Sequence, residues 1–201
     1  MPKNEPTKRA QAAAKRKSAI LEAAVTCFIL SGYHQTGMRD IAGQAGVSLG
    51  NLYNYFAGKA DILAEIAAIE RAELEPFLEM LAQKAPALEI LETFIPAYTK
   101  HLATPETVIL ALEITSEAIR EPSVAAMFTE SRNALIKALG ELLTRGIDEG
   151  SLRPSQNVTE TAYLVLEVME GTAFRHGIER VPLKRLLTTQ TDFLRAALAR
   201  G

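Results

Sequence analysis

The chain has 201 residues, a formal net charge of −2 and a single cysteine, and 48% of its residues are apolar. This composition is that of a globular protein with one mid-sized core or two small domains, and no apolar run approaches the roughly 20 residues that cross a bilayer. The one cysteine, Cys27, excludes an internal disulfide, and the polar first residues exclude a secretory signal, so we expect a cytoplasmic protein without a membrane segment.

The charge is distributed unevenly along the chain. Residues 1–59 hold eight Lys or Arg against three acids, a formal charge of +5, whereas the remaining residues carry −7. A basic segment beside an acidic remainder is typical of a protein with a polyanionic partner at one end. A basic tail can also be merely solvated, so the charge alone leaves both interpretations open.

Apolar residues recur at spacings of three and four along nearly the whole chain, whereas strict alternation is absent. The sequence therefore predicts an all-α protein. Glycine and proline delimit expected helices at residues 10–30, 38–45, 49–55, 59–83, 88–102, 106–120, 124–149, 158–176 and 183–199. Cys27 is expected to be a core residue of the first helix, Pro96 to kink the fifth, and Gly177 to end the eighth.

Two short predicted helices on either side of Gly46 have the spacing of a helix-turn-helix, whose second helix can enter the major groove of DNA. Ser48 is expected to cap that second helix, where its hydroxyl can accept a hydrogen bond from the backbone. With Leu52 and Phe56 turned inward, the other side chains of this helix face outward. They are then free to contact phosphates and base edges.

This region carries a pattern of fixed residue types. Its elements are Gly32-Tyr33, Thr36, Asp40-Ile41-Ala42, Ala45-Gly46-Val47-Ser48, Gly50, Leu52-Tyr53, Tyr55-Phe56 and Lys59. In these residues the chain resembles the DNA-binding domain of the TetR family of regulators, over about a quarter of its length. Gly37 departs from the pattern, because the family usually has threonine or serine there, and so the first short helix lacks a capping hydroxyl.

The resemblance implies contacts with a double-stranded DNA operator. Thr36 and Arg39 are expected to touch the DNA backbone, and Lys59 to bind a phosphate at the start of its helix. Tyr53 and Tyr55 are expected to reach phosphates and base edges, although packing against neighbouring helices is the alternative for both, more so for Tyr55. The expected DNA-binding residues are Thr36, Arg39, Ser48, Leu49, Gly50, Asn51, Tyr53, Asn54, Tyr55 and Lys59.

The resemblance also implies two domains and a ligand. Residues 1–63, with a basic arm at about 1–16, would form a three-helix DNA-binding domain, and residues 64–201 a larger helical domain for effector binding and dimerisation. The expected function is that of a repressor released from its operator by a small molecule, with activation by ligand as the less usual alternative.

Apolar residues and a few embedded polar ones in the later helices are candidates for the wall of an effector pocket. They are Ile66, Phe77, Met80, Phe94, Tyr98, His101, Leu112, Glu113, Met127, Phe128, Tyr163, Leu166, Glu167, Met169 and Glu170. Ordinary core packing is the alternative for the apolar ones. Exposure at the surface, or an ion pair with Arg120, Arg132 or Arg175, is the alternative for the acids.

The last two predicted helices have apolar faces that could form a four-helix bundle across a two-fold axis. Such a homodimer would present its two reading helices to major grooves one turn apart, roughly 34 to 36 Å, or more widely spaced. No motif of a hydrolase, a P-loop protein or a zinc protease is present, and the three histidines lie far apart. We therefore expect no enzyme, no metal and no cofactor; a purely structural helical protein remains the other alternative.

Overall fold

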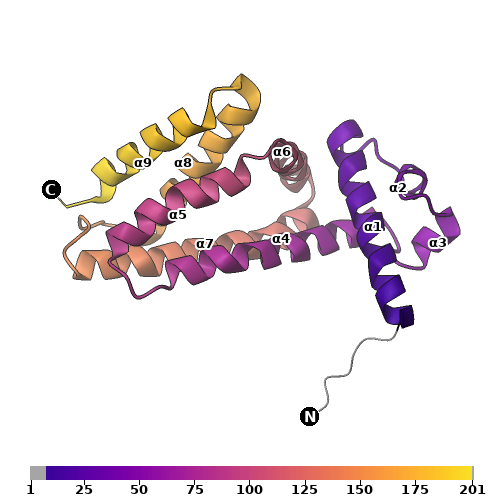
Figure 1. The fold of residues 1–201 in the computed structure, drawn as a ribbon, viewed down its shortest axis with the longest axis horizontal. Coiled ribbons are helices and arrows are strands. Elements are labelled where there is room, and N and C mark those ends of the chain that lie inside the picture. The colour runs from indigo at the N-terminus through magenta and orange to yellow at the C-terminus, as the bar shows by residue number, and fades with distance from the viewer. Residues whose placement is uncertain (1–7, 201) are drawn as a thin grey trace, which may run out of the picture. The chain divides into compact units, whose positions relative to one another are not determined.

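A computed structural model describes residues 8–200, which form helices joined by short connections (Figure 1). The helices are α1 (Lys8–Ser31), α2 (Met38–Gln44), α3 (Leu49–Tyr53), α4 (Lys59–Leu81), α5 (Ala87–Leu102), α6 (Pro105–Arg120), α7 (Pro122–Asp148), α8 (Val158–Glu179) and α9 (Leu183–Leu198). Within the described range the only β-type pairing is an isolated bridge between Leu152 and Ala199. The all-α prediction is confirmed, while the first seven residues of the expected basic arm lie outside the described residues.

The predicted helix ends agree closely with the observed ones, except at the end of α8. Gly177 does not end this helix, which continues to Glu179 and stops where Arg180 adopts a left-handed conformation, φ 53°. A Cβ atom on Gly177 would lie 2.9 Å from Cγ1 of Val108, closer than two carbon atoms can pack. The glycine therefore permits close packing against the start of α6 rather than helix termination.

The chain divides into two compact units. The first consists of residues 1–69 and 110–127, and the second of residues 70–109 and 128–201. The first unit therefore contains most of α6 and the start of α7 in addition to the N-terminal helices. The chain passes between these two units within α4, α6 and α7, and the domain boundary expected at residue 63 stays a prediction.

The core of the first unit joins α1 to the two short helices. Ile20 and Phe28 of α1, Ile41 of α2 and Leu52 of α3 are almost completely buried. Each such side chain contributes about 1.5 to 3 kcal/mol relative to its exposed state. Cys27 is a free thiol packed at the edge of this core, as expected for a core residue, and burial raises its pKa.

The core of the second unit is formed by α4, α5, α7, α8 and α9, where Phe94 and Leu139 have no exposed surface. A buried polar contact lies among these apolar side chains: Thr99 Oγ1 donates to Oε1 of Gln190 at 3.0 Å, and Gln190 Nε2 donates to the carbonyl of Val168. Gln190 thus links α9 to both α5 and α8. None of the helices in residues 8–200 has the length and apolar character needed to cross a membrane.

The turn of the helix-turn-helix depends on the backbone conformation of Gly46. Gly46 has φ +64°, its N–H donates to the carbonyl of Gly43, and the N–H of Val47 donates to the carbonyl of Ala42. This pair of bonds is a Schellman motif, which satisfies the last carbonyls of α2 and redirects the chain toward α3. No heavy atom would lie within 4 Å of a Cβ at Gly46, so only the backbone conformation requires glycine there.

The positive φ of Gly46 predicts opposite effects for substitutions at two nearby glycines. Gly46→Ala should lower the free energy of unfolding by about 1 to 2 kcal/mol, because alanine is strained at positive φ. Gly43→Ala is the matched control: it lies inside α2 with equally open space around it, and should stabilise the protein by up to about 1 kcal/mol. Urea denaturation followed by circular dichroism measures both; two changes of the same sign would contradict the role given to Gly46.

Candidate nucleic-acid interface

Helix α3 and its C-terminal cap present Gly50, Tyr53 and Asn54 to solvent. The N–H of Asn51 donates to Oγ of Ser48 at 3.2 Å, which fixes the start of the helix as expected. Leu52 is turned inward with no exposed surface, whereas Gly50, Tyr53 and Asn54 are exposed, Tyr53 to 51%. The prediction of an inward Leu52 and an outward polar and aromatic face is confirmed for these residues.

Leu49, Asn51 and Tyr55, which lie in or just after α3, are only partly exposed. Leu49 and Tyr55 pack against the core of the first unit, so the packing alternative describes much of the Tyr55 ring. Asn51 is half-buried, and its Oδ1 atom has no hydrogen-bond partner among the described residues. Arg39 and Ser48 are exposed. The open face of this region is therefore narrower than the sequence alone indicates.

Thr36 is placed differently from the expectation. It is only 2% exposed, and its Oγ1 atom lies 2.8 Å from the carbonyl oxygen of Gly32 and 3.2 Å from that of Cys27. Its hydroxyl therefore closes the turn that follows α1. In this conformation Thr36 cannot present that hydroxyl to a phosphate, which corrects the expected DNA contact.

Helix α2 begins with half of a capping box. The N–H of Gly37 donates to Oδ2 of Asp40 at 2.8 Å, while glycine has no side chain with which to accept a bond in return. The missing hydroxyl inferred from the sequence thus has its expected structural consequence. Arg39 lies beside this pair on the exposed side of the helix.

Lys59 is held by the loop after α1. Its Nζ atom donates to the carbonyl of Tyr33 at 2.7 Å and lies 4.5 Å from the centroid of the Tyr33 ring. Burial lowers the pKa of Lys59, and the carboxylate of Glu117 acts in the opposite direction. An ammonium group has three hydrogens, so Lys59 can hold this loop and still donate to another oxygen.

Two acids of α6 hold the same loop from another side. Glu113 Oε2 accepts the N–H of Tyr33 at 3.1 Å, and Glu117 Oε2 lies 2.8 Å from Nε2 of His34. Glu117 is only 5% exposed. The loop at residues 32–34 is therefore fixed between α4 and α6, a contact that sequence reasoning missed because some 80 residues separate the partners.

Four of the residues proposed for the effector pocket lie in the first unit. Ile66 belongs to its core, and Leu112, Glu113 and Met127 lie within the segment 110–127. The carboxylate of Glu113 accepts a hydrogen bond from the backbone N–H of Tyr33. The pocket role of these four residues stays a prediction, and for Glu113 the structure shows a bond to the loop after α1 instead of a free carboxylate.

The other pocket candidates lie in the second unit, where several are ordinary core residues. Phe94, Leu166 and Met169 have no exposed surface. For Glu167 and Glu170 the ion-pair alternative is confirmed, since Arg132 donates to Glu167 at 2.5 Å and also to Glu170. The remaining candidates of this unit are Phe77, Met80, Tyr98, His101, Phe128 and Tyr163. A hollow of about 180 Å³ lies instead between the ends of α7 and α9 and residues 152–155.

Two family models match the chain. The model of bacterial regulatory proteins of the tetR family matches residues 20–66. The model of the C-terminal domain of BetI-type transcriptional repressors matches residues 87–199. The first match contains the helix-turn-helix, and the second extends from α5 to the end of α9.

Individual relatives are similar over most of their length. The HTH-type transcriptional regulator RutR of Escherichia coli K12 is 30% identical over 151 residues, which are 73% of this chain and 69% of RutR. The crystal structure of FadR from Bacillus subtilis in complex with stearoyl-CoA is 26% identical, with a TM-score of 0.76 over 88% of this chain and 96% of FadR. A transcriptional regulator from Saccharomonospora viridis in complex with choline has a TM-score of 0.78 over 94% of this chain and 100% of its own, but at 19% identity it shows the fold alone.

The buried position of Thr36 predicts a structural role that can be measured. Thr36→Val keeps the shape of the side chain but removes the hydroxyl, so the free energy of unfolding should fall by about 1 kcal/mol. Thr115→Val is the control, because Thr115 is exposed on α6 in the same unit, and should change stability little. Equal urea midpoints for wild type and Thr36→Val would contradict this assignment.

Proposed function

The chain belongs to the TetR family of bacterial regulatory proteins, and from this premise we propose how it contacts its operator, its partner subunit and its effector. Membership makes it a ligand-responsive transcriptional regulator with a helix-turn-helix, and not an enzyme. We propose that it represses transcription as a homodimer and leaves the operator when a small molecule binds within the second unit. The repressor direction is supported by the BetI-type match to residues 87–199.

The exposed face of α3 supports the proposed DNA contact. Tyr53 and Asn54 offer a hydroxyl and an amide for phosphates and base edges, and Gly50 allows the backbone to approach closely. Arg39 on α2 and Lys59 at the start of α4 add positive charge for the DNA backbone. Ser48, Leu49, Asn51 and Tyr55 complete the proposed surface, with smaller contributions from the half-buried members. Thr36 acts by shaping the preceding turn.

Exposed apolar side chains on α8 and α9 support the homodimer. Leu164, Ile178 and Phe193 are 64%, 70% and 61% exposed in the single chain. Large apolar residues on the surface of a protein often mark an interface. Gly171 of α8 has no heavy atom of its own chain within 4 Å of a Cβ position, which leaves room for a partner helix to approach. A two-fold pairing of these helices would present two copies of α3 to one duplex.

The effector is proposed to bind in the second unit. The FadR relative binds stearoyl-CoA in its crystal structure, whereas the structure from Saccharomonospora viridis contains choline. These ligands differ in charge and size, so similarity to relatives supports a small-molecule effector without selecting its chemical class.

The proposed DNA surface is tested with an operator selected by the protein from random-sequence duplexes. Tyr53→Ala should lower affinity about tenfold, from the loss of roughly 1 to 3 kcal/mol of base and phosphate contacts. Arg39→Ala should weaken binding and reduce the salt slope by about one unit, because one phosphate contact is lost. Fluorescence anisotropy at several salt concentrations measures both.

The matched control for the loss of charge is Lys137→Ala, since Lys137 is exposed on α7 in the second unit. Its affinity and salt slope should equal those of the wild type. Failure of the unliganded protein to select any duplex would overturn the proposal. The same holds if Tyr53→Ala and Arg39→Ala bind as tightly as Lys137→Ala.

The proposed dimer is tested by introducing charge into its apolar face. Phe193→Glu should shift the protein from dimer to monomer in sedimentation velocity, because a carboxylate would be buried without a partner in the bundle. Leu30→Glu changes a side chain of similar exposure, 77%, on α1 and should leave the dimer intact. A Phe193→Glu protein that sediments like the wild type would exclude this interface.

A further inference from the structure

Helix α1 is longer than the core of the first unit requires. It begins at Lys8, but the first of its side chains to be buried is Ile20. Residues 8–16 are exposed on every side of the helix. With a rise of about 1.5 Å per residue, roughly 18 Å of helix therefore precedes the buried part. Figure 1 shows this end of α1 extending past α2 and α3.

The extending part of α1 has a basic face, which consists of Lys8, Arg9, Lys15 and Arg16. Lys8 and Lys15 lie seven residues apart, which is nearly two full turns, and the two arginines have the same spacing. The four cations therefore form two adjacent rows, with only the methyl group of Ala12 between them. All four are exposed, and none forms an ion pair with another residue in the described part of the chain.

These cations are unfavourable for the helix itself. The N-terminus of a helix carries a partial positive charge, so acids stabilise its first turn and cations destabilise it. The first turn of α1 contains no acid, and the first acid of this helix is Glu22. No buried apolar side chain offsets the repulsion, because residues 8–16 are all exposed. A departure from local preference without a structural gain is typical of a functional surface.

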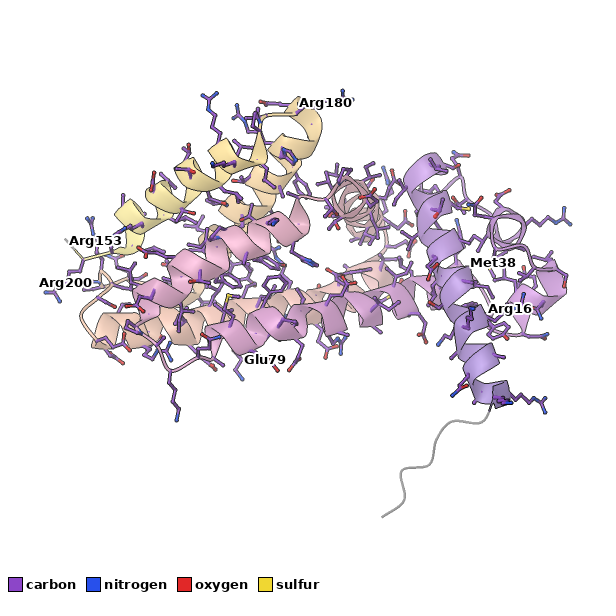
Figure 2. The ribbon with its side chains drawn as sticks, viewed as in Figure 1. Arg16, Met38, Glu79, Arg153, Arg180 and Arg200 are labelled. Atoms are coloured by element: carbon purple, nitrogen blue, oxygen red, sulfur yellow. The ribbon has the colours of Figure 1, made fainter. Side chains whose placement is uncertain are left out.

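The basic face begins beside the end of α3. Lys17, the next residue along the chain, has its Nζ atom 5.7 Å from the centroid of the Phe56 ring, which follows α3. The same ammonium group pairs with Glu65 of α4 at 2.7 Å. Arg16, labelled in Figure 2, precedes the buried Ile20 by about one turn, so both lie on one side of α1. The basic face is thus fixed to the same small core as α3 and extends away from the end of that helix.

We propose that the basic face of α1 binds DNA phosphates that flank the base pairs contacted by α3. This inference rests on the proposed function and deepens it, because it adds a second contact to the same duplex. The rows of cations are about 10 Å long, and a duplex carries one charge for about every 1.7 Å of its axis, so several phosphates face each row. Ala12 lets the DNA backbone approach the helix closely. Contacts of lysine and arginine with phosphate add affinity but no sequence preference.

An anionic membrane fits the basic face less well than DNA does. A helix that lies on a membrane inserts large apolar side chains, such as leucine or phenylalanine, among the lipids. Between Lys8 and Ala19 the only apolar residues of α1 are alanines. Charge alone would hold these turns at a bilayer, whereas charge is the main source of affinity for a DNA backbone.

Fluorescence anisotropy of the full-length protein with two duplexes tests the flanking contact. The shorter duplex is the selected operator trimmed to the base pairs that the protein specifies. The longer duplex adds one helical turn of arbitrary sequence on each side. The wild type should bind the longer duplex about tenfold more tightly and with a steeper salt dependence, because more counterions are released.

The double variant Arg9→Gln, Arg16→Gln should lose most of this preference for the longer duplex. Its salt slope on that duplex should fall by about 0.9 for each lost phosphate contact, or roughly two units per bound subunit. Its affinity for the shorter duplex should stay near that of the wild type. The matched control is Lys100→Gln, Lys137→Gln, which removes the same charge from exposed positions of the second unit and should keep the wild-type preference.

Two further measurements separate a DNA contact from a structural effect. Without DNA, the melting temperature of Arg9→Gln, Arg16→Gln should equal or exceed that of the wild type, because the removed cations oppose the helix dipole. Amide hydrogen exchange in residues 10–18 should slow when the longer duplex is added, since flanking phosphates then hold these turns. The shorter duplex should leave this exchange unchanged.

The outcomes distinguish this inference from the proposed function. If the wild type binds both duplexes equally, or if the double variant matches its control, the flanking contact is wrong although the protein still selects its operator. If vesicles of phosphatidylglycerol slow exchange in residues 10–18 and the longer duplex does not, the basic face binds a membrane and the inference is wrong. If the protein selects no duplex at all, the proposed function fails and this inference fails with it.

Discussion

The short helix α3 depends entirely on the core beneath it. A helix of five residues is unstable alone, because nucleation costs more than so few hydrogen bonds return. Burial of Leu52 and Phe56 against α1 holds α3 in place, and the Gly46 turn sets its direction. Tyr53 and Asn54 can face outward only because these apolar neighbours face inward. The proposed recognition of DNA thus rests on the packing of a small hydrophobic core.

The loop after α1 connects this core to later parts of the chain. Lys59 from α4 and Glu113 and Glu117 from α6 bind the backbone or side chains of Tyr33 and His34. Helix α6 begins in the second unit and ends in the first, and α4 and α7 also pass from one unit to the other. These three helices therefore join the two units covalently.

An ion pair accounts for two acids that the sequence offers as pocket candidates. Arg132 of α7 pairs with both Glu167 and Glu170 of α8, so one guanidinium serves two carboxylates. The sequence gives this ion pair only as an alternative, because helical periodicity does not say which helix Arg132 faces.

The order of residues along the chain was enough to predict the helices, the Ser48 cap and the inward Leu52, because these follow from spacings of a few residues and from local backbone chemistry. It also contained the family pattern around α2 and α3. The tertiary structure was needed to show that Thr36 is buried, that Lys59 holds a loop and that Glu113 binds the backbone of Tyr33. Each of these depends on contacts with residues outside the local window, and helical periodicity carries no information about which distant residue will face a given side chain.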